Sequence, residues 1–224
     1  MPFRLFGPDH LAALALTLLV GAALIGLVRR DPLGRVARAV RFVLAGLLLA
    51  AITAYLLNEG VQRQLSVLDL LPLHLCDLLI FVAAYALLTL RAGPCELLYF
   101  WSGGTLLAMV TPNLAAGFPH PYFFVFFGLH GLVVVAAAVV TFGCGRTPRE
   151  GSAWRVFAWT LAYAALVGGV NLAFDTNFLF LCGKPEQPTL LDWLGPWPLY
   201  LATTALVALL LFHGMARPFR RRSA

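Results

Sequence analysis

Residues His10–Val28 read HLAALALTLLVGAALIGLV, and this stretch decides the class of fold. It contains no charged side chain and is followed at once by Arg29 and Arg30. A helix of this length, at about 1.5 Å per residue, crosses a hydrocarbon core about 30 Å thick. A signal peptide carries its charges before the apolar run, so we interpret the stretch as a membrane span that is retained.

The composition of the whole chain agrees with a membrane protein. Apolar residues make up 61% of the 224 residues and charged residues 12%, against about 45–50% and about 25% in soluble domains. The low charge and the 17 Phe exclude disorder, and four Cys are too few for a disulfide scaffold. We predict an all-α, polytopic protein, a single domain over residues 1–224 formed by a bundle of seven transmembrane helices. The spans are expected near His10–Val28, Val36–Leu57, Leu70–Leu90, Glu96–Val110, Tyr122–Phe142, Trp154–Phe174 and Pro198–His213.

The basic residues predict how the bundle is oriented. Thirteen of the 16 Arg and Lys fall in segments on one side of the predicted spans: Arg29, Arg30, Arg35, Arg38, Arg41, Arg91, Arg146, Arg149, Arg155, Arg217, Arg220, Arg221 and Arg222. Arg4, Arg63 and Lys184 fall on the other side, together with Asp9, Glu59, Asp69, Asp175, Glu186 and Asp192. Since cytoplasmic loops are rich in Lys and Arg, we expect the N-terminus outside and the C-terminus in the cytoplasm. The net charge of +6 then indicates topology and contact with anionic lipid, and it requires no nucleic-acid partner.

Two short motifs recur in the second half of the chain. Asp9-His10-Leu11 resembles Leu129-His130-Gly131, and Val67–Pro72 resembles Leu190–Pro196. The spacing predicts parallel three-helix repeats over residues 5–90 and 122–214, joined by a linker helix over 95–112, as in some transporters. Short matches in apolar sequence also arise by chance, so both interpretations stay open, and superposition of the two helix triplets would decide between them.

Ionisable side chains cluster at the outer end of the third predicted span, where residues 71–78 read LPLHLCDL. At about 100° per residue in a continuous helix, His74 and Asp77 would lie about 60° apart on one face, and Cys76 about 160° from His74. His130 falls at a similar depth in the fifth span. Because ionisable groups inside a membrane are costly, we predict a catalytic site of His130, His74, Asp77 and Cys76. The alternatives are an interhelical hydrogen-bond network and, for Cys76, inert packing.

Other polar side chains end or open spans in the same outer half. We predict that they bind substrate in a polar cup: Asn58, Glu59, Asn113, Asn171, Asn177 and Tyr200. Helix caps and interfacial anchors are the alternative for several of them, including Asp175. His10 and His213 lie at the boundaries of spans, so we interpret His10 as interfacial and exclude both from the site.

The spacing of these residues does not indicate a metal. Two His and one Asp suit a divalent ion chemically, but the spacing lacks the HExxH type of signature. A Ser-His-Asp site is not indicated either, because no nucleophile elbow is present. We therefore expect no metal and no cofactor.

Several motifs together resemble one family: Leu71-Pro72-Leu73-His74-Leu75-Cys76-Asp77, Thr111-Pro112-Asn113, Phe118-Pro119-His120, Phe127-Gly128-Leu129-His130, Asn177-Phe178-Leu179 and Leu191–Pro198. Over roughly Ala54–Tyr200 the chain resembles the bacterial YwaF-type integral membrane proteins, which are similar to eukaryotic transmembrane protein 164. The resemblance implies a location in the bacterial cytoplasmic membrane and phospholipid acyl transfer by a Cys and a His.

The two residues of that implied mechanism map unequally onto this sequence. The histidine of the family corresponds to His130, whereas Leu73 stands where the resemblance places the cysteine of a Pro-Cys-His motif. Cys76 follows three residues later. Either Cys76 substitutes from the next turn, or the protein forms no thioester.

Three hypotheses follow for the function. The first is a lipid-active enzyme in which His130 is the general base, His74 and Asp77 orient groups or stabilise charge, and Cys76 is the nucleophile. The second is a transporter or binding protein for a small polar solute, and the third is a scaffold without chemistry. Membrane lipids are the expected partners, a lipid substrate included, and the oligomeric state is left open. An enzyme predicts His74 and His130 within hydrogen-bond range, and a transporter predicts a polar path toward the cytoplasm.

Overall fold

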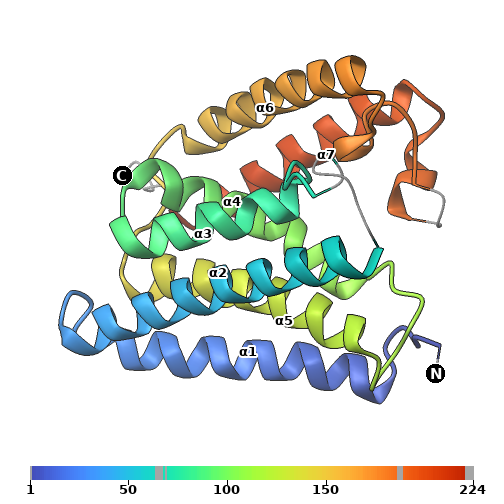
Figure 1. Ribbon diagram of the computed structural model, residues 1–224. Helices are drawn as coiled ribbons and strands as arrows, with labels where there is room; N and C mark the ends of the chain where they lie inside the picture. Colours follow the sequence, from blue (N-terminus) through green and yellow to red (C-terminus); the bar gives the residue numbers. More distant parts are fainter. Residues whose placement is uncertain (1, 64–67, 69, 186–188, 220–224) are drawn as a thin grey trace. The chain divides into compact units, whose positions relative to one another are not determined.

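The computed structural model describes residues 2–63, 68, 70–185 and 189–219 (Figure 1). These residues form α-helices and no β-strand, although an isolated bridge pairs Pro2 with Ala116. The helices are α1 (Pro8–Arg29), α2 (Arg35–Arg63), α3 (Leu75–Thr89), α4 (Ala92–Val110), α5 (Pro121–Ala138), α6 (Ser152–Phe174) and α7 (Leu199–Ala216). A π-helical turn, η1 (Val139–Gly143), extends α5, and the short turns η2 (Phe178–Phe180), η3 (Leu190–Leu194) and η4 (Arg217–Phe219) follow later.

The prediction of an all-α fold is confirmed. Within the described residues, five helical segments are long and apolar enough to cross a membrane: Pro8–Arg29, Arg35–Gly60, Pro121–Gly143, Ser152–Phe174 and Leu199–Phe219. The apolar helix α3 is shorter, with 15 residues. The count of seven spans and the orientation stay predictions. Val67, Asp69, Glu186 and Arg220–Arg222, which the repeat and the orientation used, lie outside the described residues.

The predicted start of the third helix is wrong. The sequence places it at Leu70, but α3 begins at Leu75, so His74 precedes the helix and Asp77 lies in its first turn. The expected shared helix face of His74 and Asp77 therefore does not exist. Pro72 disfavours helical backbone at Leu71, so a helix cannot run through from Leu70 although the apolar run continues. The second helix differs in the other direction, because α2 continues past Asn58 and Glu59 to Arg63.

The chain divides into two compact units. The first comprises Met1–Pro72 and Cys76–Thr147, so it holds α1, α2, α4, α5 and nearly all of α3. The second comprises Leu73–Leu75 and Pro148–Ala224 and holds α6 and α7. The three-helix repeats stay a prediction.

Helix α5 is the centre of the first unit, where it contacts α1, α2 and α4 (Figure 1). In the most apolar 18 residues of Pro121–Gly143, which is α5 with its π-helical extension, 56% of the residues are buried. The corresponding share in α1 is 11%. Gly131 permits the close approach of α1, because a Cβ at this position would lie 2.9 Å from Oγ1 of Thr17. Met109, Phe123 and Phe127 form a buried cluster beside this contact. The side chains of α5 are therefore positioned from several directions at once.

Arg41 of α2 fixes the C-terminal end of α3. Its Nε donates a hydrogen bond of 2.6 Å to the carbonyl oxygen of Leu87, and its Nη2 donates one of 3.2 Å to that of Leu88. The last carbonyls of a helix lack partners within the helix, and an arginine side chain satisfies them. Arg41 is buried at this position, so the charge and the carbonyl dipoles stabilise each other.

Candidate functional site

A small cavity in the first unit collects three of the predicted catalytic side chains. Residues of α3, α4 and α5 line it: Cys76, Asp77, Ile80, Thr105, Leu129, His130 and Val133. We refer to it as the Cys76–His130 cavity. Its volume is about 30 Å³, which is enough for a water molecule. Ile80, Thr105, Leu129 and Val133 are buried, so a thiol, a carboxylate and an imidazole share a largely apolar chamber.

The hydrogen bond of His130 determines the tautomer of its ring. Its Nδ1 lies 2.9 Å from the carbonyl oxygen of Phe126. A carbonyl oxygen only accepts, so Nδ1 carries the proton and donates, and Nε2 of the neutral ring keeps its lone pair. The Phe126 ring stacks on the imidazole, with centroids 4.2 Å apart and planes at 25°. The ring is thus oriented with one nitrogen in the form that a general base requires.

Cys76 and Asp77 reach the cavity because α3 begins where it does. Leu75 is the first residue of α3, and the next two residues form its first turn. Cys76 is a half-buried free thiol, and a thiol becomes a nucleophile when a neighbouring base takes its proton. The arrangement supports nucleophilic or water-activating chemistry.

His74 belongs to the second unit, whereas the other three predicted catalytic residues belong to the first. Its ring centroid is 5.5 Å from that of Phe178, with the planes at 66°, and 5.3 Å from that of Phe180. The preceding residue, Leu73, accepts a 2.9 Å hydrogen bond from the Tyr163 hydroxyl. His74 and His130 belong to different units, and the hydrogen bond expected between them stays a prediction.

The predicted substrate ligands of the first unit occupy different environments. Glu59 is buried and accepts a 2.6 Å hydrogen bond from the Tyr122 hydroxyl of α5. Asn58 is exposed on α2, and Asn113 is exposed in the segment between α4 and α5. Glu59 therefore joins two helices, whereas the two asparagines lie at the surface of this unit.

The predicted ligands of the second unit hold its long loop together. Asn171 is buried at the end of α6; its Oδ1 accepts from Phe178 N and Thr176 Oγ1, and its Nδ2 donates to the Phe178 carbonyl, each at 2.9 Å. Asn177 is exposed; its Oδ1 accepts from the Cys182 N–H, and its Nδ2 donates to the Gly183 carbonyl, both at 2.9 Å. These amide groups provide partners for backbone groups that no regular helix satisfies.

Tyr200 connects α7 to the same loop. It is buried, and its hydroxyl donates a hydrogen bond to the Phe180 carbonyl. The ammonium group of Lys184 lies 5.5 Å from the centroid of the Tyr200 ring. That Asn171, Asn177 and Tyr200 bind substrate stays a prediction.

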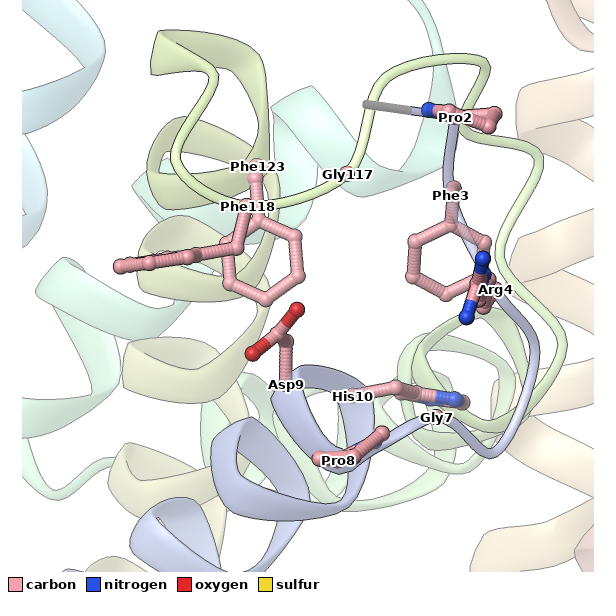
Figure 2. A pocket seen from close by; sticks show the side chains of 10 residues that line it. All are labelled: Pro2, Phe3, Arg4, Gly7, Pro8, Asp9, His10, Gly117, Phe118 and Phe123. Carbon is pink, nitrogen blue, oxygen red and sulfur yellow. The ribbon is translucent and has the colours of Figure 1, made fainter.

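Sequence reasoning missed a larger cavity at the beginning of α1, which ten residues line (Figure 2). The interpretation of His10 as an interfacial residue did not anticipate its burial within the protein, where it is 1% exposed. Its Nδ1 accepts a 3.0 Å hydrogen bond from the Phe6 N–H, and its Nε2 donates one of 2.8 Å to the Met109 carbonyl. The Nε2 bond therefore joins α1 to the end of α4, and the Nδ1 bond holds the segment before α1 against it. The missed signal is residues 2–7, which fold back on α1 and on the segment before α5.

Within the described residues, no three His, Cys, Asp or Glu side chains are grouped so that they could hold a metal ion. Apolar helices long enough to span a membrane, with ionisable side chains buried between them, define the class as a polytopic helical membrane protein. The model of the TMEM164 family matches residues 5–216, and the chain belongs to this family. The resemblance to transmembrane protein 164 is thereby confirmed, while the relation to YwaF-type proteins stays a prediction. No curated protein and no solved structure matches the chain significantly.

Proposed function

We propose that the chain is a lipid-active enzyme that transfers or hydrolyses an acyl chain of a phospholipid at the Cys76–His130 cavity. One observation carries the proposal: Cys76, Asp77 and His130 line the same chamber, although they come from two helices far apart in sequence. The family membership supports a membrane context. Lipids reach such a site by diffusing within the bilayer.

The chemistry assigns one role to His130 and one to Cys76. In a transfer reaction, Nε2 of His130 takes the proton of the Cys76 thiol, and the thiolate attacks the ester carbonyl of the lipid. The bond between the acyl carbon and the lipid oxygen breaks, the imidazolium returns the proton to that oxygen, and a lysophospholipid leaves. Nε2 of His130 then takes the proton of an alcohol or water, whose oxygen attacks the thioester carbonyl. The bond between the acyl carbon and Sγ breaks, and the imidazolium returns the proton to the Cys76 thiolate. In direct hydrolysis, His130 activates the water instead, and Cys76 only lines the chamber.

The volume of the cavity constrains how substrate enters. A space of about 30 Å³ holds a water or the end of a carbonyl group. An acyl chain cannot enter it as a whole, so reaction requires α3 and α5 to separate locally. Cys76 and Asp77 lie in the first turn of α3, so such an opening has to reach only the beginning of that helix.

Lipid analysis of membranes that carry the full chain tests the proposal. We expect the protein to change the lysophospholipid content or the acyl-chain composition, and His130→Ala to lower that rate by about 10²–10⁴-fold through loss of the general base. His213→Ala is the matched control, because Nδ1 of His213 makes the same kind of bond, 2.9 Å to the carbonyl of Leu209. Identical lipid profiles with the wild-type protein and with His130→Ala would remove the proposal.

A second variant separates the two chemical routes. Cys76→Ala abolishes transfer through a thioester, together with hydroxylamine-labile labelling of the protein by a radioactive fatty acyl group. Direct hydrolysis does not use the thiol, so it continues in Cys76→Ala. Loss of lipid turnover in His130→Ala but not in Cys76→Ala therefore indicates water as the nucleophile.

We also propose the orientation of the bundle with the N-terminus outside a bacterial cytoplasmic membrane. The unequal division of basic residues, thirteen against three of 16, supports it. Cys182 is exposed in the loop between α6 and α7, which this orientation puts outside. A membrane-impermeant maleimide should label Cys182 in intact cells, with Cys182→Ser as the control. Labelling of Cys182 only in permeabilised cells would place the loop in the cytoplasm and would contradict the proposed orientation.

A further inference from the structure

The cavity at the beginning of α1 combines opposite charges with aromatic walls. It has a volume of about 290 Å³, and Arg4 and Asp9 are among the residues that line it. Figure 2 shows Arg4 beside Phe3 on one side, and Asp9 close to Phe118 and Phe123 on the other. We call it the N-terminal cavity. Its size is close to the lower end of the range for small-molecule sites, about 300–1,000 Å³.

The walls of the N-terminal cavity are held in place without a ligand. The Phe3 N–H donates a 3.2 Å hydrogen bond to the Ala115 carbonyl, and Pro2 forms a bridge with Ala116. Below them, both ring nitrogens of His10 are engaged, one to the Phe6 N–H and one to the Met109 carbonyl. A site whose walls are already ordered loses little conformational entropy on binding.

An apolar groove continues from the N-terminal cavity along α1 and α5. It has a volume of about 350 Å³ and shares Asp9, Phe118 and Phe123 with that cavity. We call it the α1–α5 groove; its other lining residues are Ala12, Ala13, Leu16, Thr17, Phe124, Phe127 and Gly128. Gly128 borders open space, because a Cβ there would meet no heavy atom within 4 Å. A charged end and an apolar extension thus form one continuous site.

We propose that this site binds a zwitterionic phospholipid. The phosphate pairs with the guanidinium of Arg4, which suits phosphate oxygens. The ammonium group lies between the Asp9 carboxylate and the rings of Phe118 and Phe123, where cations are attracted to aromatic faces. One acyl chain occupies the α1–α5 groove. An anionic headgroup would approach Asp9 without compensation, and a purely cationic ligand would approach Arg4.

The inference goes beyond the proposed acyl chemistry. The N-terminal cavity and the α1–α5 groove share no residue with the Cys76–His130 cavity. On α5, Gly128 precedes His130 by two residues, so the two lie on nearly opposite faces of the helix. Binding at this site can therefore be measured whether or not the protein turns over lipid.

Native mass spectrometry of the purified full chain, titrated with phosphatidylcholine or with phosphatidylglycerol of the same acyl chains, tests the proposal. We expect the wild-type protein to bind one phosphatidylcholine in preference to phosphatidylglycerol. Arg4→Gln should weaken binding of both lipids about fivefold, as expected for a partly solvated charge pair. Asp9→Asn should weaken only phosphatidylcholine and reduce or reverse the preference.

Two glycine substitutions test the groove. Gly128→Leu should lower the affinity for both lipids by at least fivefold, because the new side chain fills the space of the acyl chain. Gly26→Leu, on α1 and also without a heavy atom within 4 Å of its Cβ, is the matched control and should bind as the wild type does. Thermal unfolding of each variant shows that it is folded.

Two results would overturn the inference. The first is wild-type affinity for phosphatidylcholine in both Arg4→Gln and Asp9→Asn. The second is binding of glycerophosphocholine as tightly as phosphatidylcholine, with no effect of Gly128→Leu, which would assign the site to a soluble zwitterion.

Discussion

Replacing one buried amide should weaken the long loop of the second unit far more than replacing an exposed one. Asn171→Ala removes three hydrogen bonds of 2.9 Å, to Phe178 N, the Phe178 carbonyl and Thr176 Oγ1. Each such bond contributes about 1 kcal/mol net, and the backbone groups left behind are buried. The expected loss in the free energy of unfolding is about 3 kcal/mol.

Asn177→Ala supplies the comparison within the same loop. It removes two hydrogen bonds of the same length, from the Cys182 N–H and to the Gly183 carbonyl. Asn177 is exposed, so water replaces these partners and the expected loss is below about 1 kcal/mol. Counting bonds alone would instead predict a ratio of three to two between the variants.

Thermal unfolding in lipid nanodiscs, followed by tryptophan fluorescence, measures both losses. At about 2–4 °C per kcal/mol for a chain of this size, Asn171→Ala should lower Tm by about 6–12 °C and Asn177→Ala by less than about 4 °C. Hydrogen exchange should show faster exchange of the Phe178 amide in Asn171→Ala. An Asn177→Ala loss equal to that of Asn171→Ala would refute the reasoning from burial.

Three further predictions follow from buried polar groups. Tyr122→Phe removes the 2.6 Å bond to buried Glu59 and should cost about 1.5–3 kcal/mol in chemical denaturation; an unchanged midpoint would show that water takes the place of the hydroxyl. Arg41→Met should cost more than Arg41→Lys, which can still donate to one carbonyl at the end of α3, and equal losses would contradict the capping role. Burial raises the pKa of Cys144, so less thiolate is present in the folded protein at a given pH. Maleimide should therefore label Cys144 more slowly than exposed Cys182 near pH 8, and the labelling of Cys144 should become faster as the pH rises. Since the folded state favours the protonated thiol, the free energy of unfolding should also fall as the pH rises above the ordinary thiol pKa. Equal labelling rates of the two thiols would contradict this.

Length and composition of the apolar runs were enough to predict the helices, but not where one of them starts. The run around Leu70–Leu90 is continuously apolar, so its pattern does not show that the helix begins only at Leu75. Pro72 carried the local signal, because proline restricts the residue before it. That start decides the site, since it puts Cys76 and Asp77 in a first turn and leaves His74 outside the helix.

Long-range contacts explain what the sequence could not predict. His130 and Cys76 were expected together on grounds of depth, and both line one cavity. His10 occupies a similar place at the end of an apolar run, yet it is buried by the fold-back of residues 2–7. Hydropathy describes how a residue partitions between water and lipid, and it contains nothing about a distant segment that covers that residue.

The proposed orientation gives the guanidinium of Arg41 two roles, one during membrane insertion and one in the folded protein. In the proposed orientation it is one of the thirteen positive charges that favour the cytoplasmic side during membrane insertion. Once the helices have assembled, the same charge is buried against the last carbonyls of α3. A neutral side chain there should change both the fraction of chains inserted in each direction and the lifetime of the assembled protein. The first effect is measured as the topology of the inserted chain, and the second as the stability of the assembled protein.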